Sequence, residues 1–257
     1  MLLLITCTIF ASPMNRQEQD LLAHLRQTLD QHGLDILHFL EDFVPVNEQT
    51  EYFQYTERLR RDDPPFERTE EVTRLFSPDA SIEEKKRSLA LLASIPDVEA
   101  YRAIETYHSS PQEPELQNWA SMSLVSSRIV LNAELSGQPQ LYISSGLGGR
   151  DKKLRFFALF TAENEAIPFT PLQRDIIERE FDFQLKHAGV AVEKFEIRDN
   201  YFTALLLFPF SCDIRATLKA AVVECNNYGN FIDGSFLVTN IKELSEEDIT
   251  KIMKAEK

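Results

Sequence analysis

The sequence is poor in the residues that mark several protein classes. It has three cysteines, Cys7, Cys212 and Cys225, which are too few and too scattered for a disulfide framework or a CxxC motif. Eight glycines and twelve prolines in 257 residues exclude collagen-like and low-complexity chains. No segment approaches the roughly twenty apolar residues of a membrane-spanning helix. We therefore expect a folded protein without a membrane span, in the reducing cytoplasm.

Sequence motifs for known chemistry are also missing. The five histidines show neither HxH nor HExxH spacing, and no GxSxG nucleophile elbow is present. The phosphate-binding patterns GxGxxG and GxxxxGK[ST] are absent as well. The sequence thus predicts no metal site, no cofactor and no catalytic residue, and it favours a protein that is not an enzyme.

Positive charge is scarce in the first half of the chain. Residues 1–138 hold 12 Lys and Arg against 23 Asp and Glu, a net charge of −11, whereas residues 139–257 hold 15 against 18, a net charge of −3. A field of this sign disfavours docking of the first half on nucleic acid or on an anionic membrane. A local basic site in the second half remains compatible with these numbers.

Residues 1–13 form an almost wholly apolar tail. The tail lacks a basic region and is short for a signal peptide. Three interpretations stay open: translation from Met14, an unstructured appendage, or a short signal for export.

Residues 14–137 carry helical patterns throughout. Apolar residues from Asn15 to Phe43 follow a helical spacing that Gly33 divides in two. The segment Ser81-Ile82-Glu83-Glu84 has the form of a capping box, in which a hydroxyl and a carboxylate satisfy the first amides of a helix. We therefore expect an all-α region before a junction at Gly137-Gln138-Pro139.

Part of this region resembles HEAT-like α-helical repeats, which stack pairs of short helices. The resemblance covers about residues 81–135 and implies a protein-binding scaffold without chemistry of its own. A plain helical bundle is the alternative. The residues that carry the resemblance are Leu89, Leu92, Ile95, Pro96, Asp97, Val98, Tyr101, Ile104, Leu116 and Trp119.

Residues 138–243 read as strand, helix, strand, strand, helix, strand between Leu154 and Ile241. Thr170 and Asp213 provide helix caps, and Tyr201 to Phe208 is apolar enough for a central strand buried on both faces. This order is that of a ferredoxin-like βαββαβ sandwich, so the predicted fold class is α+β. Residues 244–257 form a charged tail with a short helix.

An extra strand at Leu141 to Ile143 precedes this domain and raises a topological problem. A hairpin to the first core strand would compete with the last strand for the same edge of the sheet. Either the extra strand displaces the last one, or it pairs elsewhere.

The loop between residues 144 and 153 is the most unusual in the chain. Its glycines, Gly146, Gly148 and Gly149, allow backbone conformations that other residues avoid. The cations outnumber Asp151 by three, so backbone amides and basic side chains together could hold an anion. A bulged hairpin with solvated charges is the alternative. The basic residues of this predicted anion- or partner-binding site are Arg150, Lys152, Lys153 and Arg155.

The helix that begins at Thr170 has two apolar stripes on opposite sides. Leu172, Ile176 and Phe183 form one, and Ile177, Phe181 and Leu185 form the other. Only one stripe can cover the sheet. We assign Ile177, Phe181 and Leu185 to a contact with the N-terminal helices or with a second subunit.

The second core helix ends in a polar cluster of Asn226, Asn227 and Tyr228. These residues could face a ligand, but the pattern favours helix capping and loop turning. The same helix places Cys225 on its apolar face, as a core residue.

Three functions remain compatible with the sequence. The leading hypothesis is a non-enzymatic protein-interaction, regulatory or scaffold module with an unidentified protein partner, including a second copy of the chain. The alternatives are an RNA- or ribosome-associated protein that uses the basic glycine-rich loop, and an enzyme that binds phosphate or another anion at that loop.

Overall fold

The computed structural model describes residues 2–4, 8–9, 36–62, 64–138 and 140–255. It consists of two compact units. Unit 1 comprises Met1–Ile5 and Asn15–Gly148, and unit 2 comprises Thr6–Met14 and Gly149–Lys257. The combination of helices with a curled antiparallel sheet confirms the expected α+β class. Among the described helices, none is long and apolar enough to cross a membrane.

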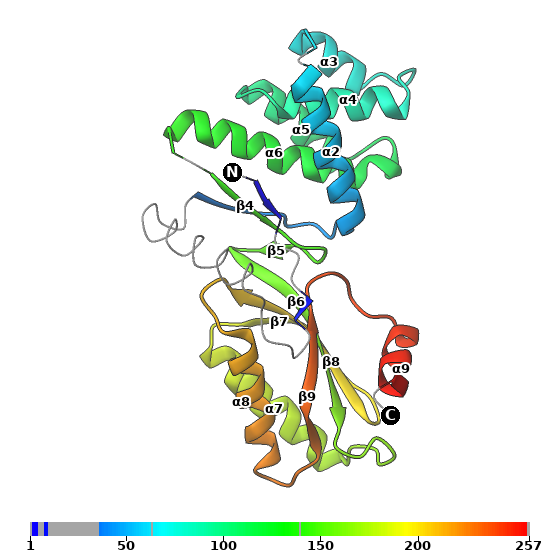
Figure 1. Ribbon diagram of the computed structural model, residues 1–257, viewed down its shortest axis with the longest axis vertical. Coiled ribbons are helices and arrows are strands. Elements are labelled where there is room, and N and C mark those ends of the chain that lie inside the picture. Colours follow the sequence, from blue (N-terminus) through cyan, green and yellow to red (C-terminus); the bar gives the residue numbers. More distant parts are fainter. Residues whose placement is uncertain (1, 5–7, 10–35, 63, 139, 256–257) are drawn as a thin grey trace. The chain divides into compact units, whose positions relative to one another are not determined.

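Unit 1 is built mainly from helices that pack on one another (Figure 1). The predicted capping box at Ser81 and Glu84 is present at the start of α4. Leu89, Ile104 and Leu116 are fully buried in the core between these helices. The helical elements of unit 1 are α2 (Val46–Asp62), α3 (Arg68–Leu75), α4 (Ile82–Ala93), α5 (Val98–Ser109), the 3-10 turn η2 (Pro114–Leu116) and α6 (Gln117–Ser136).

A small parallel sheet also belongs to unit 1. It contains β1 (Leu2–Leu4), β4 (Leu141–Ser144) and β3 (Leu37–Phe39), in the order β1-β4-β3. Residues 37–39 form a strand where a helix was expected, which corrects that prediction, and residues 2–4 form a strand as well. The helix predicted before residue 36, including the break at Gly33, lies outside the described residues.

The placement of β4 resolves the competition expected at the sheet edge. The backbone of this strand pairs with β1 and β3, so it is not an extra strand of the ferredoxin-like domain. Leu40 N–H extends the ladder by donating to the carbonyl of Ile143 at 3.3 Å. The division between the units accordingly follows Gly148, later than the junction expected at residues 137–139.

Unit 2 has the predicted βαββαβ order. Strands β9, β6, β8 and β7 are adjacent in that order and antiparallel, which is the arrangement of a ferredoxin-like sheet. Two short strands extend it: β2 (Thr8–Ile9) pairs with β9, and β5 (Gly149–Arg150) pairs with β6. The other elements are β6 (Lys153–Ala162), α7 (Pro171–His187), β7 (Ala191–Ile197), β8 (Tyr201–Pro209), α8 (Ile214–Asn226), β9 (Ile232–Thr239) and α9 (Glu246–Ala255).

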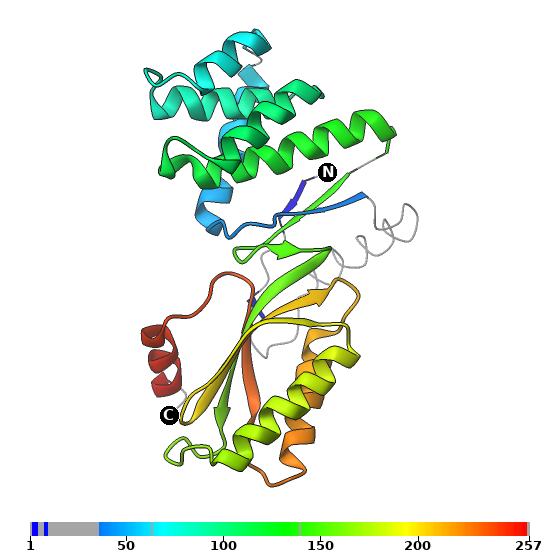
Figure 2. The same ribbon diagram turned by 180° about the vertical axis from the view of Figure 1, so that it is seen from behind.

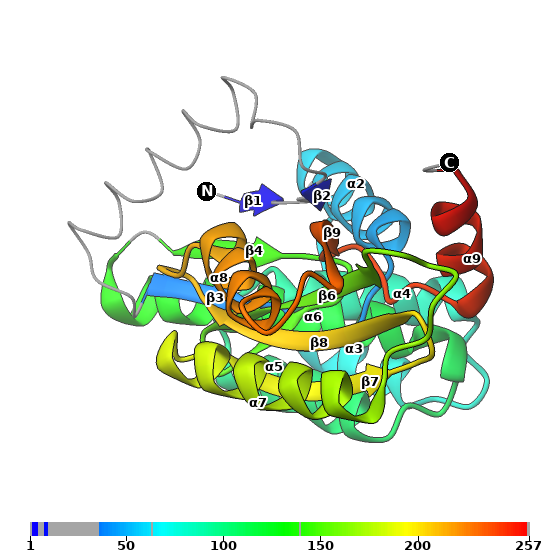
Figure 3. The same cartoon turned by 90° about the horizontal axis from the view of Figure 1, so that it is seen from below.

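The helices of unit 2 lie on both sides of this sheet. Helices α7 and α8 pack on each other and cover one face, whereas α9 lies across the sheet from them (Figures 2 and 3). The middle strands β6 and β8 are buried along nearly their whole length. A strand buried on both faces carries an unbroken apolar run, as the sequence between Tyr201 and Phe208 does.

Candidate functional site

Helix α7 has a clear start and a clear inner side. Thr170 and Gln173 form the predicted capping box, with Pro171 at the first helical turn. Ile177, Phe181 and Leu185 are fully buried. The ring of Phe181 lies 5.0 Å from that of Phe160 and 5.1 Å from that of Phe202, on β6 and β8.

These contacts correct the assignment of the two stripes. Ile177, Phe181 and Leu185 were expected to face another domain or subunit, but they form the stripe that covers the sheet. This stripe faces the sheet because the ring of Phe181 packs edge to face on the rings of Phe160 and Phe202, which β6 and β8 present to the helix.

The opposite side of α7 carries the exposed apolar residues. Leu172 and Phe183 are 69% and 62% exposed. They are eleven positions apart, which places them within about 20° of one another around the helix at roughly 100° per residue. Phe183 stacks on His187 one turn later, with ring centroids 6.4 Å apart. Leu172, Arg179 and Phe183, which follow one line along the helix, are called the outer stripe below.

The outer stripe continues toward the end of α8. The guanidinium of Arg179 lies over the ring of Tyr228, 5.4 Å from its centroid. Tyr228 is itself 61% exposed. A single surface of the α7–α8 layer therefore offers aliphatic, aromatic and cationic groups to the solvent.

The two asparagines of the predicted polar cluster have local partners. The side chain of Asn226 donates to the carbonyl of Ile232 at 2.8 Å and accepts from the backbone amides of Phe231 and Ile232. Asn227 donates to Glu224 at 3.0 Å. Asn226 thus closes the loop between α8 and β9, whereas Asn227 and Tyr228 are exposed.

The glycine-rich loop is divided between the units, and its first part is buried in unit 1. Gly148 has a φ of +66°, and a Cβ there would lie 2.4 Å from the carbonyl oxygen of Asp42. Gln49 donates to the carbonyl of Ser145 at 3.0 Å. Position 148 therefore requires glycine, because the backbone of Asp42 approaches it too closely for a side chain. Gly146 is also buried.

The second part of the loop is a tight hairpin in unit 2. Asp151 and Lys152 have positive φ values of 53° and 59° between the paired residues Arg150 and Lys153, as in a type I′ turn. Gly149 again marks a close approach, because a Cβ there would lie 2.3 Å from the carbonyl oxygen of Lys153.

Most cations of this hairpin already have partners within unit 2. Lys153 donates to the carbonyl of Gly189 at 2.7 Å. Arg150 pairs with Glu193 at 3.2 Å, and Arg155 binds the same carboxylate through two N–H groups. An anion would have to compete with Glu193 for both arginines. The predicted anion site at this loop remains a prediction.

Glu193 is held by a bulge in the edge strand β7. The register between β7 and β8 shifts between Val192 and Lys194, so Glu193 is the extra residue. Its side chain is mostly buried, and the hydrogen bonds from Arg155 lower the pKa of its carboxyl against the opposing effect of burial. The arrangement is a bidentate ion pair that ties the edge strand to β6.

Strand β6 offers no exposed aromatic ring on the sheet face away from α7. Phe157 belongs to β6 and points away from α7 because it alternates with Phe160, yet it is only 4% exposed. Sequence-specific recognition of single-stranded RNA by such sheets depends on exposed aromatic rings. This observation weakens the RNA alternative.

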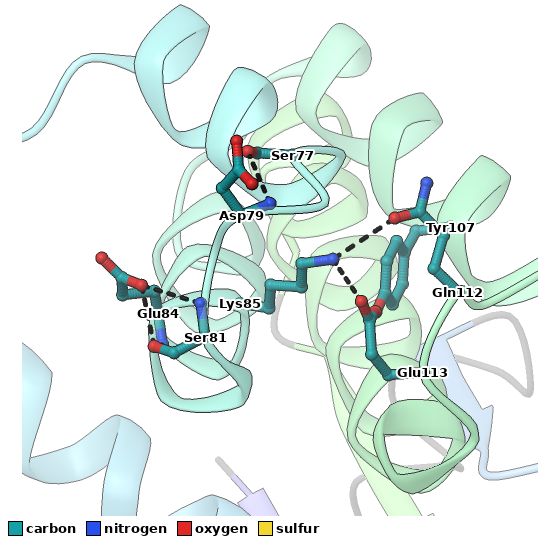
Figure 4. Close-up of polar contacts among 8 residues, drawn as sticks. All are labelled: Ser77, Asp79, Ser81, Glu84, Lys85, Tyr107, Gln112 and Glu113. Carbon is teal, nitrogen blue, oxygen red and sulfur yellow. Dashed lines mark hydrogen bonds and ion pairs between the residues drawn. The ribbon is translucent and has the colours of Figure 1, made fainter.

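A buried lysine in unit 1 is the most strongly enclosed charge among the described residues. Lys85 has a fully buried side chain and pairs with Glu113, which also accepts from the hydroxyl of Tyr107 (Figure 4). Burial opposes ionisation of Glu113, but the hydrogen bonds from Lys85 and Tyr107 outweigh it and lower the pKa of its carboxyl. Burial, followed by the neighbouring carboxylate, raises the pKa of Tyr107. Every polar group of this cluster has a partner, so it fastens α4 to the segment after α5.

His108 has both an acidic and a hydroxyl neighbour, but the geometry is not that of a catalytic triad. Its Nε2 lies 2.9 Å from Asp42 and 3.1 Å from the hydroxyl of Ser121. A triad requires contacts through opposite ring nitrogens. No group of three or more potential metal ligands occurs within the described part of the chain.

Sequence reasoning missed two cations on α8. Arg215 and Lys219 line a pocket of about 240 Å³ together with residues of β9. Their spacing of four residues, which places both on one side of a helix, was the available signal.

Comparison with known proteins gives no family for this chain. No protein-family model matches the sequence, and no curated protein matches it. The solved structures with partial similarity include a REP-associated tyrosine transposase bound to a REP hairpin, with 10% identity and a TM-score of 0.33 over 39% of this chain. The matched part spans 62% of that structure.

Two further structures are similar over a comparable length. One is described as a transposase from Deinococcus radiodurans R1, with 14% identity and a TM-score of 0.34 over 40% of this chain and 88% of that one. The other is a homoserine dehydrogenase from Thiobacillus denitrificans, with 11% identity and a TM-score of 0.23 over 50% of this chain and 29% of that one. TM-scores of this size carry no argument about function.

Proposed function

We propose that this protein is a non-enzymatic protein-interaction module and that its partner docks on the outer stripe of α7. The observation that carries the proposal is the exposure of Leu172 and Phe183 on the same side of a helix whose other side is fully buried. A helix that only covers a sheet needs one apolar side. A second apolar side on α7 is explained if that side becomes buried in a complex.

The composition of this surface supports a protein partner. Aromatic residues and arginine are enriched in interface cores and among the residues that dominate binding energy. Phe183, Tyr228 and Arg179 provide these groups, and the guanidinium of Arg179 lies over the ring of Tyr228. Burying the phenylalanine alone contributes about 2 kcal/mol, which is a useful part of a specific interface.

The buried charged groups support a role without catalysis. Lys85 and Glu113 bind each other, Arg155 binds Glu193, and Glu71 accepts from Ser88, Arg74 and Arg87. Each of these carboxylates is held by partners that stabilise its charged form. None of them faces a cleft as a free acid or base, so their arrangement serves packing.

Site-specific photo-crosslinking tests this function. A photoreactive amino acid at position 183 should crosslink a defined protein in the native cell, or a second copy of the chain. The same amino acid at position 135, where Leu135 is also exposed but lies on α6 of unit 1, is the matched control. Equal crosslinking patterns at both positions, or none at position 183, would contradict the proposal.

A further inference from the structure

The pocket between α8 and β9 is separate from the outer stripe and from the glycine-rich loop. It measures about 240 Å³ and lies on the side of α8 that faces β9. Arg215 and Lys219 line it from the helix, and Gly234 and Ser235 line it from the strand.

Two cations of α8 line the pocket without an acidic partner among the described residues. Arg215 and Lys219 are exposed, and the described part of unit 2 provides no ion pair or hydrogen bond to either of them. The neighbouring carboxylates are engaged elsewhere, because Asp213 caps the amide of Ala216 and Asp233 accepts from the amide of Ser235. Two like charges four residues apart on a helix repel each other. A bound anion would relieve that repulsion.

A bulge in β9 creates the hollow opposite these cations. The register with β6 runs from Phe160 paired with Phe236 to Ala162 paired with Ile232, so one residue of β6 faces three residues of β9. Gly234 is in the middle of these three, and a Cβ added there would meet no atom within 4 Å. Bulges of this kind redirect the backbone and re-aim side chains at functional sites.

The remaining lining of the pocket is apolar. Val238 is buried, and Phe236 packs its ring 5.3 Å from that of Phe160. Small-molecule sites combine such apolar walls with a few polar groups that fix the orientation of the ligand. A volume of about 240 Å³ is below the range of sites for drug-sized ligands, so the occupant has to be small.

From this geometry we infer that the pocket binds a small organic anion. The carboxylate or phosphate group of the ligand lies between Arg215 and Lys219, with the hydroxyl of Ser235 within the same lining. A short apolar body packs on Phe236 and Val238. This site is independent of the proposed docking surface on α7.

Titration of the full-length, ¹⁵N-labelled protein tests the inference. The probes are 3-phenylpropionate and phenyl phosphate, with inorganic phosphate as the head group alone. At least one of the organic probes should shift the amide signals of Gly234 and Ser235 and should bind more tightly than inorganic phosphate. The two organic probes distinguish a carboxylate ligand from a phosphate ligand.

Two variants make the test specific. The double substitution Arg215→Gln and Lys219→Gln should weaken binding by about tenfold or more, since charge-assisted hydrogen bonds are the strong ones. Lys251→Gln and Lys254→Gln on α9 remove the same charge from residues that do not line the pocket and should leave affinity within about twofold, because salt screens exposed charges that do not contact the ligand.

Gly234→Leu blocks the pocket without changing its charge. The position has open space and no positive φ, so the variant should keep its fold and lose the binding of the organic probes. The inference is overturned if no probe shifts these amides, if inorganic phosphate binds as well as both organic probes, or if the α8 and α9 variants weaken binding equally.

Discussion

The guanidinium of Arg155 on β6 binds the carboxylate of Glu193 on β7 across the intervening strand β8. Their side chains are only 7% and 17% exposed. The pair is bidentate, and it joins an edge strand to the centre of the sheet. Breaking a buried pair leaves an uncompensated charge, which costs far more than losing a surface pair.

We expect Glu193→Gln to lower the free energy of unfolding by about 3 kcal/mol at pH 7. The pKa of the Glu193 carboxyl is lowered in the folded state, so its contribution is complete above the unfolded-state pKa of about 4.3 and disappears as the pH falls through the lower folded-state value. Urea denaturation at pH 7 and pH 3 should show a gap between wild type and variant that closes in acid.

The matched control is Glu196→Gln on the same strand. Glu196 pairs with Lys194 and Arg198 at the surface, and such pairs contribute about 0–1 kcal/mol. Equal unfolding free energies for Glu193→Gln and wild type at pH 7 would contradict the expectation.

Lys85→Met should destabilise unit 1 by about 3 kcal/mol, because Glu113 would keep its charge without its cationic partner. The double variant Lys85→Met and Glu113→Gln should recover at least half of that loss. Fluorescence of Trp119, the single tryptophan of the chain and a residue of unit 1, follows the unfolding in urea. A double variant no more stable than Lys85→Met would rule out the uncompensated charge as the cause.

Gly148→Ala and Gly137→Ala separate steric crowding from backbone conformation. Both glycines have φ values near +65°, but only a Cβ at Gly148 would overlap backbone carbonyls. We expect Gly137→Ala to cost about 1 kcal/mol and Gly148→Ala about 3 kcal/mol or more. Trp119 fluorescence in urea again follows the unfolding. Similar losses of unfolding free energy in both variants would show that a Cβ at position 148 does not overlap the backbone carbonyls.

Cys212 and Cys225 should differ in reactivity. Burial is the main cause that raises the pKa of the Cys225 thiol, to about 12, whereas Cys212 is partly exposed. In a Cys7→Ser background, a thiol-reactive reagent at pH 8 should modify Cys212 rapidly and Cys225 only in denaturant. Rapid modification of Cys225 in the folded protein would show that the helix does not enclose it.

Much of the fold could be predicted because its signals are local. Thr170, Ser81 and Asp213 cap the helices that the sequence assigned to them. The strand at residues 37–39 was missed, since three residues within a helical spacing carry no distinct period of their own. Its partner β4 lies about a hundred residues later, and no local pattern encodes a parallel pairing over that distance.

The candidate surface could be predicted only in part. The helical wheel of α7 showed two apolar stripes, but the choice between them depends on Phe160 and Phe202, which come from other elements. The glycines of the loop were visible, whereas the approach of Gly148 to the carbonyl of Asp42 was not. Glu193 became a partner for two arginines through a bulge that shifts its register by one residue.

The central claim is that the outer stripe of α7 is a docking surface. Its most direct test is the dissociation constant between the purified chain and the protein crosslinked at position 183, or the self-association constant if that protein is a second copy. Leu172→Ser with Phe183→Ser should weaken binding by about a hundredfold, as expected when two buried anchors are removed, and should leave the unfolding free energy unchanged. An affinity within about twofold of wild type would contradict the claim.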